Sequence, residues 1–280
     1  MNKIRIKCPA KINLTLEVVN RREDGFHNIK SIMQLISLYD YLNISVEESQ
    51  ENQIILQGTS NEIPYNEKNL VYKAADLFLK ESKIKNVKIT IFIEKNIPIA
   101  AGLAGGSTDG AGTIYGLNLI FDEPLSKEKM HNLCAKLGSD LNVCLEGGCL
   151  LTSSRGEKVQ KLPVLDYGLT LIKPKNLGIS AGEAYTKYDL KPTEDRDYTG
   201  KMLEALKAKS DIQHLIYNDL EYAVFDDYEE LKTIKEKLPH SIMSGSGSTY
   251  FVLEDVDADF GSNYQVIKNL KFIETGVEKV

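Results

Sequence analysis

Residues 97–118 constrain the fold of this chain more than any other stretch, because glycine and alanine dominate them and large side chains are rare between Pro98 and Thr113. Apolar and polar residues alternate just before, over residues 87–94, which predicts a half-buried strand. Ser107 to Asp109 are residue types that cap helices, and residues with helical spacing follow them. The sequence therefore predicts a strand, a glycine-rich loop and a helix in that order.

Such a loop can bind phosphate, because small residues let several backbone N–H groups surround an anion at a helix N-terminus. The hydroxyls of Ser107 and Thr108 are candidate ligands for a phosphate oxygen or its metal. The alternative is a tight turn with close helix packing, and a glycine cluster alone does not decide between the two. No lysine follows the glycines as in a Walker A loop, and the spacing is not that of a dinucleotide-binding turn.

The glycine-rich stretch does match the phosphate loop of one particular kinase superfamily in its residues. The stretch resembles the ATP-phosphate loop of the galactokinase, homoserine kinase, mevalonate kinase and phosphomevalonate kinase superfamily. The resemblance implies that ATP contacts Pro98, Gly102, Leu103, Ala104, Gly105, Gly106, Ser107 and Thr108. It also implies Mg²⁺ as cofactor, with Ser107 as the candidate contact to the metal of Mg-ATP.

The composition favours a protein that binds or modifies small molecules. The 280 residues contain 34 basic and 40 acidic side chains, a net charge of −6, which argues against a nucleic-acid-binding surface. No apolar run approaches the roughly 20 residues that span a bilayer, and the first residues lack a signal-peptide core, so we expect a cytoplasmic protein without membrane contact. The four cysteines lack zinc-site spacing and are expected to be reduced and buried.

Residues 4–18 alternate between apolar and polar types, which predicts a strand pair or a bent strand. In a strand, Lys11 and Asn13 share one face. A lysine on a strand is most often solvated, so Lys11 alone indicates little. Residues 9–13, however, resemble the first motif of the same superfamily, which implies a catalytic Lys11 and a substrate-binding Asn13.

Residues 22–42 resemble one family within this superfamily. Gly25-Phe26-His27 follows a turn signal, and an aromatic residue beside a histidine is usually a packing feature. Together with the later Met-Gln and Leu-Tyr-Asp steps, the segment resembles the 4-diphosphocytidyl-2-C-methyl-D-erythritol kinases of the non-mevalonate isoprenoid pathway. The resemblance implies that Phe26 stacks on cytosine, that His27 hydrogen-bonds its edge, and that Tyr185 is a further aromatic contact.

Asp140 follows a helix that Ser126 is expected to cap and Gly138 to end. A second short helix is expected over residues 141–146, so Asp140 alone reads as an N-cap. The resemblance implies instead that Asp140 accepts the proton of the substrate hydroxyl that attacks the γ-phosphorus of ATP. Lys11 would keep the carboxylate ionised and balance the developing charge.

The resemblance implies an α+β fold of two domains, with the active site in the cleft between them. We expect an N-terminal ATP-binding and catalytic domain of the ribosomal-protein-S5-like type over residues 1–160. A C-terminal domain, a ferredoxin-like α/β sandwich, is expected over residues 161–280, with a polar loop at 189–199. A glycine-serine turn at 243–252 is the third motif of the superfamily, which closes against the phosphate loop. A monomer or weak homodimer is expected.

Two alternatives stay open. Another small-molecule kinase of the superfamily would act on homoserine, mevalonate or a sugar, but would not need Phe26, His27 and Tyr185. A non-catalytic RNA-binding protein on the same fold conflicts with the acidic charge and the Lys11 and Asp140 pair. Three departures from the family pattern leave room for altered substrate affinity. Residues 141–143 stand where Val-Pro-Phe is usual, which implies a different shape beside the substrate pocket, Ala181 replaces a usual threonine, and Ser248 replaces a usual proline.

Overall fold

The computed structural model describes residues 2–154, 156, 158–194 and 196–280, and it contains two β-sheets. The larger sheet has the strand order β12-β1-β2-β4-β3, with β5 and β8 paired to β2 and β1, and β6 paired to β5. Its strands are β1 (Asn2–Arg21), β2 (His27–Glu48), β3 (Gln53–Gly58), β4 (Val87–Glu94), β5 (Cys149–Ser154), β6 (Lys158–Leu162), β8 (Tyr217–Asn218) and β12 (Glu278–Lys279).

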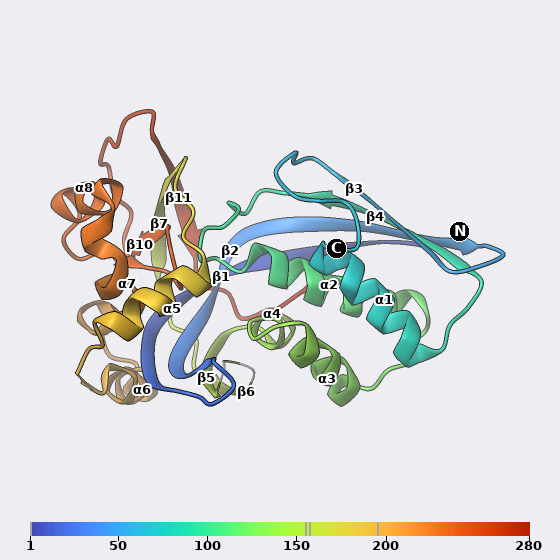
Figure 1. Ribbon diagram of the computed structural model, residues 1–280, viewed down its shortest axis with the longest axis horizontal. Helices are drawn as coiled ribbons and strands as arrows, with labels where there is room; N and C mark the ends of the chain where they lie inside the picture. Colours follow the sequence, from blue (N-terminus) through green and yellow to red (C-terminus); the bar gives the residue numbers. More distant parts are fainter. Residues whose placement is uncertain (1, 155, 157, 195) are drawn as a thin grey trace.

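The antiparallel hairpin of β1 and β2 runs through most of the molecule (Figure 1). Its register shifts at three places, the first between Pro9 and Ala10, and such irregularities bend and twist a strand pair. As a result, Ile6 packs under the helices of the large sheet, whereas Ile12 belongs to a second core shared with the small sheet. The prediction of a bent strand is confirmed, and the bend carries the hairpin from one core to the other.

Four helices cover one face of the large sheet (Figure 1). They are α1 (Leu70–Ser82), α2 (Gly105–Ile120), α3 (Lys127–Leu137) and α4 (Leu141–Glu146). A Cβ added at Gly112 would lie 2.4 Å from Cys8 Sγ, and one at Gly116 would lie 2.7 Å from Ile44 Cδ1. The glycines inside α2 therefore let this helix pack closely on β1 and β2, at an intrinsic cost of about 1 kcal/mol each relative to alanine.

The small sheet has the order β11-β7-β10-β9. Its strands are β7 (Gly168–Pro174), β9 (Ile242–Met243), β10 (Tyr250–Val252) and β11 (Tyr264–Lys271). Four helices and two 3₁₀ turns belong to the same part of the chain: α5 (Ala181–Leu190), α6 (Tyr198–Ala208), η1 (Gln213–Leu215), α7 (Asp219–Val224), η2 (Phe225–Asp227) and α8 (Glu229–Lys237). They gather at one end of the molecule (Figure 1).

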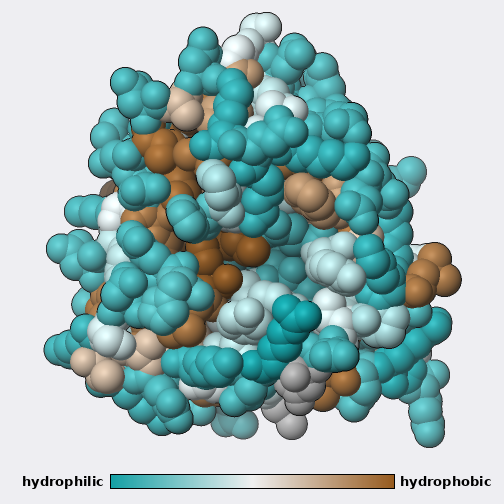
Figure 2. All heavy atoms as spheres, turned by 90° about the vertical axis from the view of Figure 1, so that its left-hand side faces the viewer, coloured by the Kyte–Doolittle hydropathy of each residue, from teal (hydrophilic) through white to brown (hydrophobic). Residues whose placement is uncertain are grey.

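The fold is α+β with two sheets, as expected. The chain leaves the large sheet after β6, but it returns twice, because β8 pairs with β1 beside Thr15 and β12 pairs with β1 beside Ile6. The division at residue 160 stays a prediction. Figure 2 looks onto the small-sheet end, whose surface is mainly hydrophilic with apolar side chains gathered in one strip. Within the described ranges, no helix is both long enough and apolar enough to cross a membrane.

Candidate active site

Lys11 lies on β1 near the bend of the hairpin, and its side chain is almost completely buried, with 3% of the residue exposed. Its Nζ donates hydrogen bonds to Asn13 Oδ1 at 2.7 Å and to the carbonyl oxygen of Gly102 at 2.9 Å. Asp140 Oδ2 lies 3.5 Å from the same nitrogen. A buried ammonium group needs such partners, so the solvated-lysine alternative is wrong.

Asn13 is itself held in one orientation. Its Nδ2 donates to Ser31 Oγ at 2.9 Å, and the Ser31 hydroxyl donates to the carbonyl oxygen of Thr15. An inverted amide would place Nδ2 against the Lys11 ammonium, so this chain of hydrogen bonds keeps the Asn13 oxygen on Lys11. Ser31 was absent from the sequence-based site because nothing in its neighbourhood marks it.

Asp140 precedes α4 but does not cap it. The residue has φ −85° and ψ −12°, and its side chain makes no capping hydrogen bond. The N-cap interpretation is therefore wrong, and the carboxylate, 26% exposed, faces Lys11 instead.

The departure at residues 141–143 lies away from the cleft. Leu141 and Val143 are fully buried, and the Asn142 amide oxygen lies 3.0 Å from His131 Nδ1. None of the three lines the cleft beside Asp140. The expectation that they reshape the substrate pocket is therefore not supported by the packing.

The glycine-rich loop lies between two cavities. The first, which we call the central cleft, has a volume of about 570 Å³, and its wall includes Lys11, Asn13, Phe26, His27, Gly102, Ala104, Ser107, Asp140 and Tyr185. The second, the loop cavity, has a volume of about 360 Å³, and its wall includes Ile63, Pro64, Lys68, Lys95, Pro98, Gly102, Leu103, Ala104, Gly105, Gly106 and Asp109. Gly102 and Ala104 line both, so a phosphate chain crossing this loop can reach from one cavity to the other.

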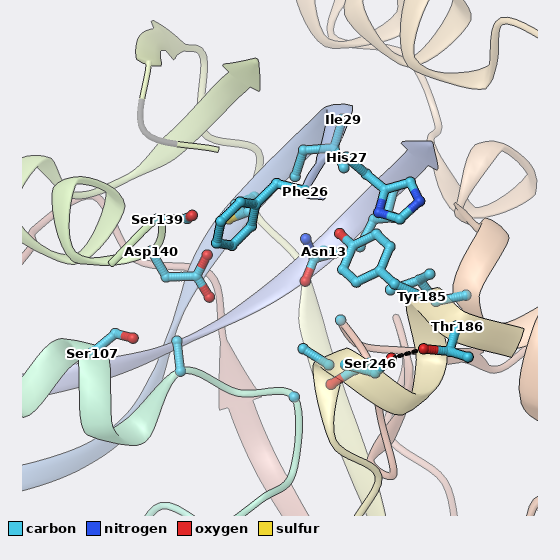
Figure 3. Close-up of a pocket in the computed structure, with 18 of the residues that line it drawn as sticks. Asn13, Phe26, His27, Ile29, Ser107, Ser139, Asp140, Tyr185, Thr186 and Ser246 are labelled. Atoms are coloured by element: carbon cyan, nitrogen blue, oxygen red, sulfur yellow. Dashed lines mark hydrogen bonds between the residues drawn. The ribbon is translucent and has the colours of Figure 1, made fainter. Parts of the chain in front are cut away.

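Helix α2 begins earlier than expected. Ala104, with φ 58°, precedes its first residue, and no side chain caps the helix, so the expectation that Ser107 to Asp109 act as caps is wrong. Ser107 faces the central cleft, as Figure 3 shows. Thr108 is fully buried, lines neither cavity, and donates its N–H to the Ala104 carbonyl oxygen at 2.9 Å. The structure gives the Thr108 hydroxyl no place in either cavity wall, and its assignment as a phosphate ligand stays a prediction.

The glycine-serine turn of the small sheet packs on the glycine-rich loop, as the superfamily resemblance implied. Ser244 Oγ donates to the Gly102 carbonyl oxygen at 3.0 Å, and the Thr249 N–H donates to the Ala101 carbonyl oxygen at 3.3 Å. A Cβ on Gly102, which has φ +75°, would lie 1.9 Å from the Ser244 carbonyl oxygen. Only glycine fits at this contact between the two loops.

Two buried residues at the start of α7 form hydrogen bonds with the backbone of the glycine-serine turn. Asn218 Nδ2 donates to the carbonyl oxygens of Met243 at 2.6 Å and Gly245 at 2.8 Å. The Glu221 carboxylate accepts the Met243 N–H at 2.8 Å. Both side chains are buried, so they fix the position of the turn over the cleft. The sequence shows only a short polar cluster at 218–221, which does not reveal its partner.

The rings of Phe26, His27 and Tyr185 line the central cleft, and Figure 3 shows Phe26 beside Asp140. Phe26 follows the hairpin turn and is 56% exposed, so it is not a packing residue. His27 is 8% exposed, and its ring stacks on Tyr185 of α5 with centroids 4.8 Å apart and an interplanar angle of 12°. In Figure 3 the Phe26 and Tyr185 rings lie on opposite sides of Asn13.

A buried ionic cluster borders the loop cavity. Lys95 Nζ lies 2.9 Å from Asp109 Oδ2 and also contacts Asp40, and all three side chains are nearly inaccessible. Burial raises the pKa of Asp109 to about 7, and Asp40 adds to this rise, while the Lys95 charge opposes it. The folded protein therefore holds a proton on Asp109 more strongly than the unfolded chain does.

This cluster predicts how Asp109→Asn changes the pH dependence of stability. Between about pH 4 and pH 7 the folded wild type binds more protons than the unfolded chain, so its free energy of unfolding falls as pH rises. As pH rises from 5 to 8, the free energy of unfolding of Asp109→Asn should therefore increase by at least about 1 kcal/mol relative to that of the wild type. Urea denaturation at both pH values measures this difference, and parallel pH profiles would contradict it.

Comparison with known proteins identifies the family of this chain. Residues 69–148 match the family described as GHMP kinases N terminal domain. A 4-diphosphocytidyl-2-C-methyl-D-erythritol kinase of Prochlorococcus marinus (strain MIT 9312) is 38% identical over 304 residues, which cover 98% of this chain and 97% of that protein. The protein of the same name from Caldanaerobacter subterraneus subsp. tengcongensis is 38% identical, with 99% of each covered. The chain belongs to the 4-diphosphocytidyl-2-C-methyl-D-erythritol kinase family.

Solved structures agree with this family assignment. A crystal structure of a 4-(cytidine 5'-diphospho)-2C-methyl-D-erythritol kinase has a TM-score of 0.73 and 29% identity, covering 89% of this chain and 90% of that one. Homoserine kinase from Cytophaga hutchinsonii has a TM-score of 0.78 at 16% identity, covering 100% and 98%, which shows a shared fold. All four of these proteins are named as kinases, in agreement with the prediction that this chain is a kinase.

Two departures from the kinase family pattern can now be placed. Ala181, at the start of α5, lines the central cleft, so a missing hydroxyl there removes a polar group from the wall. Ser248 is fully buried, and its hydroxyl donates to the Leu177 carbonyl oxygen. Serine at this position therefore has a structural partner of its own, and its side chain does not reach the cleft.

Proposed function

We propose that this protein transfers the γ-phosphoryl group of ATP to the 2-hydroxyl of 4-diphosphocytidyl-2-C-methyl-D-erythritol, in non-mevalonate isoprenoid precursor biosynthesis. The observation that carries the proposal is the position of the Lys11 and Asp140 pair. It lies in one cleft with three aromatic or imidazole rings, next to a glycine-rich loop that borders a second cavity. This arrangement suits a substrate with a base at one end and an alcohol near the phosphates.

Asp140 is the proposed general base, which accepts the proton as the substrate hydroxyl attacks the γ-phosphorus. Lys11 donates to Asn13 and Gly102, and its charge lies 3.5 Å from Asp140 Oδ2, so two of its three N–H donors have fixed partners. A cation held in this way offsets the negative charge that develops on the transferring group. Positioning and electrostatics of this kind account for most of the catalysis of phosphoryl transfer.

The loop cavity is the proposed site of the ATP base and sugar. Helix α2 has 16 residues and begins at Gly105, so the free N–H groups of its first turn lie beside the loop. These groups and the partial positive charge of the helix end favour phosphate oxygens. The ATP contacts predicted at Pro98 and from Gly102 to Ser107 remain proposals that this geometry supports.

The residues present also fit Mg²⁺. This ion usually keeps water and phosphate oxygens and takes one or two protein oxygens. Ser107 and Asp140 line the same cleft, and within the described parts of the chain there is no cluster of three metal-binding side chains that would compete. Ser107 would hold Mg²⁺ together with the phosphates, and the bound ion would neutralise phosphate charge.

A cytoplasmic location and a monomer or weak homodimer stay predictions.

Replacement of Phe26 by alanine tests the proposed substrate end of the cleft. Loss of one stacking face should raise KM for the cytidylyl substrate about 10-fold or more, while KM for ATP changes little. Steady-state kinetics with each substrate varied in turn measures both constants. Phe92→Ala is the matched control, because Phe92 is a 36% exposed phenylalanine on β4 that lines neither cavity. An unchanged KM for the cytidylyl substrate would show that Phe26 does not contact it.

A further inference from the structure

Asp189 lines the central cleft beside His27, and its carboxylate is within hydrogen-bond distance of the His27 ring. Helix α5 presents Tyr185 and Asp189 four residues apart, which places them on one face of the helix. Tyr185 stacks on the His27 ring, and Asp189 Oδ1 lies 2.7 Å from His27 Nε2. The other carboxylate oxygen, Oδ2, lies 3.2 Å from Arg21 Nη1. The imidazole is therefore fixed by one contact to its face and one to its edge.

These contacts determine which ring nitrogen carries the proton. An ionised carboxylate can only accept hydrogen bonds, and Asp189 uses its other oxygen in an ion pair with Arg21. His27 Nε2 must then be the donor, so Nδ1 of the neutral ring has a free lone pair. In the parts of the chain that the structure describes, no hydrogen bond reaches Nδ1, although His27 is only 8% exposed and lines the cleft. An unused acceptor in a buried ring points to a ligand donor.

We propose that Asp189 is a positioning residue that holds His27 in the Nε2–H tautomer and thereby selects cytosine over uracil. The inference rests on the proposed function. Cytosine has an amino group at position 4, which can donate to Nδ1, whereas uracil has a carbonyl oxygen there. With uracil, two lone pairs would face each other and both would lose their partners in a partly dehydrated site. We therefore expect about 10- to 100-fold weaker binding of the uridine ligand.

Asp189→Asn tests this with little change of size. An asparagine amide can accept from Nε2–H or donate to a bare Nε2, so it permits both tautomers, and the Nδ1–H form can donate to uracil. Calorimetric titration with CDP and with UDP gives the ratio of the two affinities. Both ligands carry the same diphosphate, so the lost carboxylate charge cancels in the ratio. We expect the CDP preference to fall at least 5-fold in Asp189→Asn. Asp226→Asn, which removes an exposed carboxylate paired with Lys191, should leave the ratio unchanged.

Nitrogen-15 spectra of the histidine rings give a second readout, which does not need a ligand. The chain has four histidines, and His27→Gln identifies the signals of His27. The wild type should show the Nε2–H tautomer, and Asp189→Asn a mixture. A wild-type His27 in the Nδ1–H form would overturn the inference even if the variant did not fold. An unchanged CDP to UDP ratio in a folded Asp189→Asn would overturn it while the proposed kinase function stood. A wild type that neither binds CDP nor phosphorylates the cytidylyl substrate would overturn both.

Discussion

Replacement of Asp140 by asparagine is expected to lower kcat by about 10³-fold and to leave folding intact. The amide has the same shape but cannot accept the proton of the attacking hydroxyl. Asp140 does not cap α4 and is 26% exposed, so the change should have a small effect on stability. Steady-state turnover and the thermal unfolding midpoint of the same preparation measure the two effects.

A matched control separates catalysis from net charge. Asp257→Asn removes one carboxylate at a fully exposed position, where its partner is Lys268, and Asp257 lines neither cavity. This variant should retain wild-type kcat. An Asp140→Asn enzyme with near-normal turnover would remove Asp140 from the proposed mechanism, and Lys11 would then have to act without a base beside it.

Replacement of Gly102 by alanine is expected to cost about 3 kcal/mol or more of stability and to lower kcat at least 100-fold. Gly102 has φ +75°, which is unfavourable for alanine by about 1–2 kcal/mol. The added Cβ would also lie 1.9 Å from the Ser244 carbonyl oxygen, so the two loops must separate. That movement would displace the carbonyl oxygen that Lys11 contacts, and with it the catalytic pair.

Gly106→Ala is the control for stability, because no atom lies within 4 Å of an added Cβ and the residue is inside the first turn of α2. Its free energy of unfolding should equal or slightly exceed that of the wild type. Chemical denaturation of both variants compares them directly. Equal stability of Gly102→Ala and Gly106→Ala would contradict the account of the contact between the two loops.

The sequence predicts the parts of this site that local pattern determines. Period-two alternation places Lys11 and Asn13 on one face of β1, and the glycine-rich stretch predicts a loop at a helix start; both agree with the structure. The pattern could not fix where α2 begins, because Ala104 adopts a left-handed conformation that is unfavourable for alanine and that no sequence signal announces. The side chain of Thr108 is fully buried and lines neither cavity, which the pattern could not show.

Contacts between segments that are distant in the chain could not be predicted from local sequence patterns. Ser31, Asn218 and Asp189 support the site from elements that a local pattern cannot bring together. Asp189 was expected in a polar loop, but α5 continues to Leu190 and places it one turn after Tyr185. Such supporting residues carry no local signature, because any polar side chain in their place would look like a surface residue.

The most direct test of the central claim is ADP release with Mg²⁺-ATP in a coupled assay. Four alcohols are compared: 4-diphosphocytidyl-2-C-methyl-D-erythritol, homoserine, mevalonate and galactose, with Asp140→Asn as the inactive control. The account predicts turnover with the cytidylyl substrate only, and loss of that turnover in the variant. Turnover with one of the other three alcohols in place of the cytidylyl substrate, or no turnover with any of them, would contradict it.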